Sequence, residues 1–237
     1  MDTQTRHALK GDKFAQATQT SVTWLSGHRT NVVRWAVSAV VVLALGIGFL
    51  IVWNTQQSAA GAALGQALDT YSSPLALPGA PPQPGTYATS RDRSKAANGQ
   101  FKAVADKYGW LPQGAKARYF AGITYQELGQ TAEAESTLKS AAGSWNRNVA
   151  NLAKVALASL YHQTNRDQQA IDLYNEIVAK PSDTVTSGAA QLYLADLYAA
   201  TGKQAQARAL WAKVKDSDKE GAAGAIAAQK LAGGQGQ

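Results

Sequence analysis

The stretch LYLADLYAATGKQAQARALWAKV, residues 192–214, carries the clearest structural signal in the chain. Its first half places a bulky apolar residue, a small residue and a tyrosine on one side of a helix. Its second half places an alanine, a large residue and a smaller apolar residue on one side of another helix. Gly202 stands between the halves and tolerates the left-handed backbone conformation that ends a helix. The stretch therefore predicts a helical hairpin, whose pattern residues are Leu194, Ala195 and Tyr198, then Ala207, Trp211 and Val214.

Both halves of this pattern recur upstream at a nearly constant spacing. The second-helix set begins at Ala97, Ala134, Ala170 and Ala207, so successive alanines are 36 or 37 residues apart. The other members of the three upstream second-helix sets are Phe101 and Val104, Leu138 and Ala141, and Tyr174 and Ile177. The upstream first-helix sets, each with its turn residue, are Ala121, Gly122, Tyr125 and Gly129, and Leu157, Ala158, Tyr161 and Asn165. The chain is therefore predicted to repeat the hairpin.

The order of apolar residue, small residue, tyrosine, turn residue, alanine and bulky residue resembles the tetratricopeptide repeat, whose usual length is about 34 residues. The period here is longer, and we expect the surplus in the links between hairpins, at residues 144–148 and 180–183. The family's usual tryptophan near the start of the first helix is missing, so the repeats, over about residues 114–216, are degenerate. The resemblance implies an all-α solenoid of about four tetratricopeptide-like hairpins.

The first of these hairpins is interrupted by an insertion. An apolar stripe from Ala60 to Tyr71 predicts its first helix, and its second helix is expected around residues 97–108. Residues 72–90 between them contain five of the seven prolines and are predicted to be extended, because proline opposes both helix and strand. They form either an insertion that the fold tolerates or a ligand for a domain that binds proline-rich segments.

The last segments of the chain are predicted to close the solenoid. Residues 221–231 are alanine-rich and weakly amphipathic, which is typical of a helix that caps the last hairpin. Residues 233–237 are expected to be disordered. The tetratricopeptide-like domain is thus predicted over residues 54–232.

A strongly apolar stretch, RWAVSAVVVLALGIGFLIVW at residues 34–53, precedes this domain. Residues 35–53 would form a helix of about 29 Å, close to the hydrocarbon thickness of a bilayer. Trp35 and Trp53 stand where indole rings favour the membrane interface. We therefore predict a retained transmembrane helix over residues 35–53 rather than a buried core helix. The small residues at 57–60 leave open the alternative of cleavage by a signal peptidase.

Basic residues around this stretch predict its orientation. None occurs between Trp53 and Arg91, whereas five precede the span, namely Arg6, Lys10, Lys13, Arg29 and Arg34. By the positive-inside rule, residues 1–34 are a cytoplasmic segment and the helical domain lies outside. The chain has no cysteine and no N-glycosylation sequon. We therefore predict a single-pass protein of the bacterial inner membrane with a periplasmic C-terminal domain.

The sequence contains little that points to catalysis. Its three histidines are His7, His28 and His162, and the predicted topology separates the first two from the third. No nucleophile elbow, zinc-protease motif or phosphate loop occurs, and the net charge of +7 comes from scattered basic residues rather than from a basic patch. We expect no enzyme activity, no cofactor, no metal, no small-molecule substrate and no nucleic-acid partner.

The first helices of the hairpins are predicted to line a largely apolar groove for a segment of another protein. Lys116 alone suits a carboxylate clamp, so recognition of a C-terminal carboxylate is not expected. In the alternative interpretation, the protein's own C-terminal helix or proline-rich loop covers these side chains. The candidate groove residues are Tyr119, Ile123, Leu152, Val155, His162 and Leu192.

A short cytoplasmic start, one uncleaved anchor and degenerate repeats on the far side are together similar to the bacterial ancillary subunit of the SecYEG translocon. This resemblance implies a scaffold in the periplasmic chaperone network, which binds the translocon, a membrane-anchored chaperone or an exported polypeptide. The proline-rich insertion departs from that family. Two other functions stay open, an envelope assembly adaptor in cell division or wall synthesis, and a cleaved, soluble peptide-binding protein.

Overall fold

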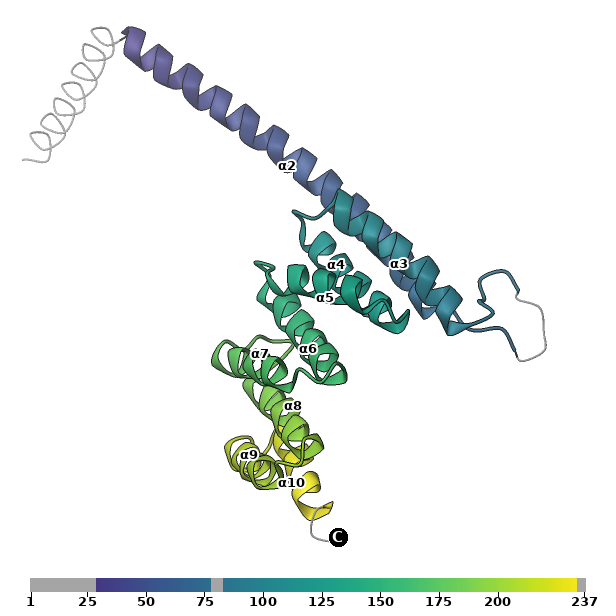
Figure 1. Ribbon diagram of the computed structural model, residues 1–237. Coiled ribbons are helices and arrows are strands. Elements are labelled where there is room, and N and C mark those ends of the chain that lie inside the picture. Colours follow the sequence, from purple (N-terminus) through teal and green to yellow (C-terminus); the bar gives the residue numbers. More distant parts are fainter. Residues whose placement is uncertain (1–28, 78–82, 234–237) are drawn as a thin grey trace, which may run out of the picture. The chain divides into compact units, whose positions relative to one another are not determined.

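Helices account for nearly all regular structure in the computed structural model, which describes residues 29–77 and 83–233 (Figure 1). Within these ranges there are nine helices and no strand, which confirms the all-α prediction. The chain divides between Thr55 and Gln56 into two units, which are described separately. Most of the predicted cytoplasmic segment (residues 1–28), Pro78, Pro81 and Pro82 of the insertion, and the tail after Gly233 lie outside the described residues.

Helix α2, Arg29–Ser72, begins with the apolar stretch. It is long and apolar enough to cross a membrane, with a mean hydropathy of 2.6 in its most apolar window, none of which is buried. Val40 and Leu45, for example, are 68% and 69% exposed. Beyond Trp53 the helix continues without a break. Its apolar stripe from Ala60 onward is buried rather than exposed, as Ala60, Leu64 and Ala67 show.

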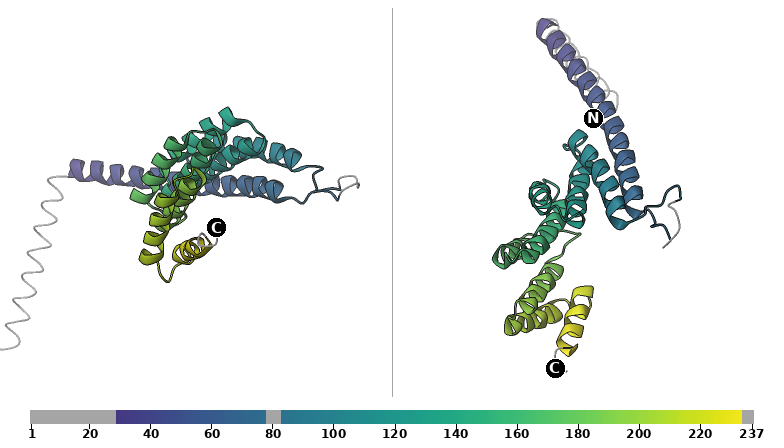
Figure 2. Two further views of the ribbon diagram at one scale, coloured as in Figure 1. Left: turned by 60° about the horizontal axis from the view of Figure 1, so that its bottom comes forward. Right: turned by 45° about the vertical axis from the view of Figure 1, so that its right-hand side comes forward.

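The remaining helices form the predicted hairpins and the capping helix (Figures 1 and 2). They are α3 Ser90–Lys107, α4 Pro112–Glu127, α5 Thr131–Ala142, α6 Arg147–Gln163, α7 Asp167–Ala179, α8 Ser187–Ala200, α9 Gln204–Ser217 and α10 Ala222–Gly233. Each helix from α3 to α10 packs against the next along the chain, α4 also packs against α6, and α10 also packs against α8. The fold is therefore a tetratricopeptide-like solenoid.

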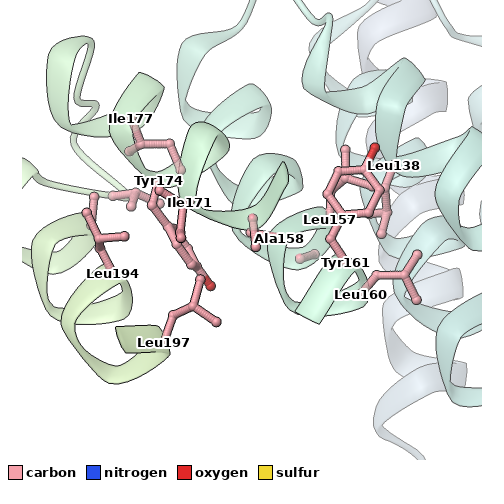
Figure 3. Close-up of a cluster of buried hydrophobic side chains, with 14 of the residues drawn as sticks. Leu138, Leu157, Ala158, Leu160, Tyr161, Ile171, Tyr174, Ile177, Leu194 and Leu197 are labelled. Carbon is pink, nitrogen blue, oxygen red and sulfur yellow. The ribbon is translucent and has the colours of Figure 1, made fainter. Parts of the chain in front are cut away.

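The repeated pattern residues form the core. The four second-helix alanines, Ala97, Ala134, Ala170 and Ala207, are fully buried, and the large residues that follow them are at most 7% exposed. In Figure 3, Leu138, Leu157 and Tyr161 lie on one side of Ala158, while Ile171 and Tyr174 of α7 lie on the other side with Leu194 and Leu197 of α8. One continuous apolar cluster thus joins α5, α6, α7 and α8.

The turns within the hairpins have the conformation that their residues predict. Gly129, Asn165 and Gly202 have φ values of 75°, 58° and 78°, so all three lie in the left-handed region. Glycine adopts this conformation without a steric penalty, and asparagine is the side chain that tolerates it best. The prediction of three equivalent tight turns is confirmed.

Polar contacts fasten consecutive hairpins to one another. The guanidinium of Arg166, in the α6–α7 turn, donates two hydrogen bonds to Glu135 of α5, at 3.1 and 2.8 Å. Lys139 is 2.6 Å from the same carboxylate. Further along, the Asn151 side chain donates to the Lys180 carbonyl at 3.0 Å, at the C-terminal end of α7. The Arg166 bonds join the α4–α5 hairpin to the α6–α7 turn, and the Asn151 bond ties the start of α6 to the end of α7 within one hairpin.

The interrupted first hairpin has its own polar connections. Asn98, buried on α3, donates to the Ala121 carbonyl and to the Thr124 hydroxyl of α4, at 3.0 and 2.9 Å. Glu127 accepts hydrogen bonds from Tyr71 of α2 and from Ser94 of α3. The C-terminal part of α2 is therefore joined to α3 and α4 despite the long insertion.

The two ends of the insertion lie together. The backbone N–H of Ala76 donates to the Tyr87 carbonyl at 2.8 Å, and that of Tyr87 donates to the Pro74 carbonyl at 3.1 Å. Among its described residues, 73–77 and 83–89, the insertion forms neither helix nor strand beyond one isolated bridge. This arrangement agrees with the extended loop expected from its prolines.

Helix α10 closes the solenoid in the way a further first helix would. A Cβ atom at Gly224 would lie 1.9 Å from the Asp218 carbonyl oxygen at the end of α9, and a Cβ atom at Gly114 of α4 would lie 2.0 Å from the Tyr108 carbonyl oxygen at the end of α3. Only glycine permits this approach of one helix to the end of the preceding one. The predicted cap is confirmed, although α10 extends to Gly233, the first residue of the expected tail.

Candidate partner-binding surface

Four of the six candidate groove residues come together on two adjacent helices. Tyr119 and Ile123 of α4, and Leu152 and Val155 of α6, are half-buried, and all four pack against the same apolar core cluster. We call these four side chains the α4–α6 face. Because they are half-exposed, they present apolar surface that a partner could cover.

Leu192 lies elsewhere. It is 7% exposed and belongs to a second buried cluster with Ala195 and Trp211, to which Ala227 of α10 contributes. The C-terminal helix therefore covers Leu192, as the alternative interpretation expected. Its position at the α8–α10 contact makes it a core residue in this structure.

His162 occupies the C-terminal end of α6, apart from the apolar face. Its side chain is 43% exposed, and its Nδ1 atom is 2.6 Å from Oδ1 of Asp167, the first residue of α7. This pair joins the end of α6 to the start of α7 across the turn of one hairpin. Its place in an exposed turn offers a partner a polar contact rather than an apolar one.

A tyrosine that the sequence pattern missed extends the α4–α6 face toward α8. Tyr193 is 43% exposed, and its ring stacks on that of Tyr174 with centroids 5.9 Å apart. After burial, the second cause that raises the pKa of Tyr119 on α4 is the nearby Tyr193 hydroxyl. The sequence analysis placed the first-helix stripe through Leu192, the residue next to Tyr193.

The hydroxyls of Tyr119 and Tyr174 stay neutral. Burial, together with the neighbouring Tyr193, raises the pKa of Tyr119. Burial, followed by the effects of Tyr193 and Asp196, raises the pKa of Tyr174 to about 12. The surface therefore combines apolar area with uncharged hydroxyl groups, which suits a peptide segment with apolar anchors better than a charged ligand.

A cluster of charged side chains, Arg166, Lys139 and Glu135, borders the ring of Tyr161. Arg166 lies 4.4 Å from the centroid of the Tyr161 ring, and its hydrogen bonds, with those of Lys139, lower the pKa of Glu135 to about 2. The carboxylate is therefore ionised throughout the physiological range. The cluster ties α5 to the α6–α7 turn.

Within residues 29–77 and 83–233, no group of three or more His, Asp or Glu side chains is arranged to hold a metal ion. One depression of about 580 Å³ lies at the start of α8, the end of α9 and the start of α10. Its lining consists mainly of small and polar residues.

Comparisons with known proteins yield two solved structures. No protein-family model matches the chain, and no curated protein matches it. The two structures are of kinesin light chain-type, nearly identical TPR-like repeats from Podosopora anserina and of a single-residue variant of them. Each is 20% identical to this chain with a TM-score of 0.48, and the match covers 60% of this chain and 76% or 77% of the other.

Proposed function

We propose that the chain is a membrane-anchored, non-catalytic scaffold that binds other proteins through the α4–α6 face and Tyr193. The observation that carries this proposal is the half-exposed apolar face built by Tyr119, Ile123, Leu152 and Val155 on two adjacent first helices. Helical-hairpin solenoids typically bind peptide segments through such first-helix surfaces.

The anchor is residues 35–53 of α2, with residues 1–34 in the cytoplasm and residues 54–232 on the periplasmic side of a bacterial inner membrane. The exposed apolar side chains of this part of α2 and the excess of basic residues before it support this topology. Retention of the anchor is supported by Ala60, which is fully buried, and by Gln57, which accepts a hydrogen bond from Gln113. Cleavage near residue 60 would remove both contacts.

Within this topology, the partners that fit are exported polypeptides, a membrane-anchored chaperone or the translocon itself. An unfolded chain emerging from the membrane offers apolar anchors in an extended segment, which the neutral, tyrosine-rich surface suits. An envelope assembly adaptor would use the same surface and topology with a different membrane partner, so identification of the captured protein separates the two.

Photo-crosslinking in native membranes tests the proposal. A photoreactive phenylalanine analogue replaces Tyr193, and in a matched control it replaces Ser136, which is exposed on α5. We expect discrete crosslinked proteins from position 193 and few from position 136. A translocon or chaperone subunit among them supports the export role, a division or wall-synthesis protein supports the adaptor role, and equal crosslinking from both positions contradicts a dedicated binding face.

A matched pair of variants tests the same face by affinity. Leu152→Asp places a charge in the half-exposed apolar face, whereas Ser136→Asp places one on an exposed part of α5. We expect Leu152→Asp to weaken co-purification of the crosslinked partner about tenfold or more, since an unpaired charge in an apolar contact is costly. The helical circular dichroism should be retained. If binding survives Leu152→Asp unchanged, or if fold and binding are lost together, Leu152 is not a binding residue.

A further inference from the structure

Two tryptophans are exposed at equivalent places in successive hairpins. Trp110 is 50% exposed in the link between α3 and α4, and Trp145 is 71% exposed in the link between α5 and α6. A tryptophan buries roughly 150–250 Å² when it packs. Two indoles with so much exposed area at one position of the repeat point to a surface that something else covers.

The links that carry these residues follow one another along one edge of the solenoid. We call residues 108–111, 143–146 and 180–186 the link edge. Helices α4 and α6 run in the same direction and pack against each other, so the links that precede them are neighbours. The third link is fastened beside the second, because the Asp183 N–H and the Thr184 hydroxyl donate to Asn148 at 3.1 and 3.0 Å.

The chain enters the helical domain at this same edge. Gln113, in the first turn of α4 and three residues beyond Trp110, donates a hydrogen bond to Gln57 at 3.1 Å. Gln57 follows Trp53, the end of the proposed span, by four residues, which bridge at most about 14 Å even when fully extended. The proposed span therefore ends four residues before a side chain that is hydrogen-bonded to the first turn of α4.

The chemistry of the link edge matches a lipid surface. Indole rings favour the membrane interface, where their apolar body and polar N–H are both accommodated. Exposed basic side chains flank or belong to the links, namely Lys107, Arg147 and Lys180, and such side chains can extend toward lipid phosphates. Asp183 is the acidic residue within the link edge.

We propose that the link edge binds the surface of the phospholipid bilayer, with Trp110 and Trp145 inserted at the headgroup level. This inference rests on the proposed span at residues 35–53. It adds a second, peripheral membrane contact to the anchor, which would restrict rotation of the helical domain and leave the opposite edge, with the Gly129, Asn165 and Gly202 turns, toward water.

Spin labelling of the full chain tests the inference, and the absence of native cysteine allows single labelling sites. The sites are Ser144→Cys beside Trp145, Gln130→Cys at the opposite edge, and Leu45→Cys in the span. Each variant is reconstituted in vesicles of phosphatidylethanolamine and phosphatidylglycerol. Collisions with oxygen, which concentrates in lipid, and with a water-soluble nickel chelate then report the depth of each label.

We expect the position-45 label to be immersed, the position-130 label to be in water, and the position-144 label to show a several-fold higher oxygen-to-nickel ratio than position 130. Adding Trp110→Ala and Trp145→Ala should return position 144 to the position-130 value while the helical circular dichroism is retained. If position 45 is immersed but positions 144 and 130 give equal oxygen-to-nickel ratios, the link edge does not bind lipid, whereas the proposed anchor is retained. If position 45 is not immersed, the span itself is wrong and this inference fails with it.

Discussion

Single small residues determine how closely the two helices of a hairpin approach. A Cβ atom at Gly122 of α4 would lie 2.6 Å from Cδ2 and 2.7 Å from Cγ of Leu138, which is fully buried on α5. Ala158 and Ala195 hold the equivalent positions in the next hairpins and are also fully buried. The first-helix position after the apolar residue therefore requires a small side chain, and in the α4–α5 hairpin it requires glycine.

A pair of Gly→Ala substitutions tests this requirement. Alanine in a helix interior stabilises by about 1 kcal/mol relative to glycine, and overpacking a fixed core costs about 1–3 kcal/mol. We expect Gly122→Ala to be net destabilising, whereas Gly65→Ala, where nothing lies within 4 Å of the new methyl group, should be stabilising. Thermal melting of the full chain in detergent, monitored by circular dichroism, should shift the Tm of the two variants by a few degrees in opposite directions. A rise in Tm for both variants would contradict close packing at Gly122.

Charged contacts join whole helices to one another, and the Glu135 cluster is one of them. Glu135 of α5 contacts both Arg166 and Lys139, and its side chain is 19% exposed. Hydrogen bonds from Arg166 and then from Lys139 lower the pKa of this carboxyl from 4.5 to about 2. Its contribution to folding is therefore fully present above about pH 4.5 and is lost as the pH falls toward 2.

The variant Glu135→Gln should reproduce that loss at neutral pH. We expect it to lower the free energy of unfolding by about 1 kcal/mol at pH 7, which is typical of a partly screened ion pair. The difference from the native chain should shrink between pH 5 and pH 2, because the native carboxylate then becomes protonated. Urea titrations across this range measure the effect, with Glu220→Gln in an exposed link as the control. A difference that does not vary with pH would show that Glu135 contributes packing rather than charge.

The helices and their core were predictable because the signal is local and repeated. Ala97, Ala134, Ala170 and Ala207 identify the second helices, and all four are fully buried. The continuous helix from the apolar stretch into the first hairpin was less visible, since Asn54, Thr55 and Ser58 are residue types that often cap helices, yet α2 runs through them.

The candidate binding surface was predictable only in part. Its α4 and α6 residues follow from the repeat register, but Leu192 is buried because α10, distant in sequence, packs on α8. Tyr193, the residue after Leu192, is the more exposed of the two. A helical stripe in the sequence does not show which of two adjacent residues faces solvent. The exposure of Trp145 likewise depends on where the links lie in space, which no local pattern encodes.

At the scale of the whole molecule, an exposed apolar helix and a solenoid with a half-exposed apolar face occur in one chain. The first is long and apolar enough to cross a membrane, and in the proposed topology a bilayer covers its exposed side chains. In the proposed function, the second is the surface that a protein partner covers. A scaffold anchored by its own first hairpin helix combines both features and restricts partner capture to one side of the membrane.

The most direct test of this account is the sidedness of the two units. Because the native chain has no cysteine, Ser21→Cys before the span and Lys203→Cys in the α8–α9 turn each create one reactive thiol. In intact spheroplasts, a membrane-impermeant maleimide should label the chain carrying Lys203→Cys and should reach that carrying Ser21→Cys only after the membrane is permeabilised. Labelling of position 21 with protection of position 203, or labelling of both in intact cells, would contradict a periplasmic scaffold on a retained anchor.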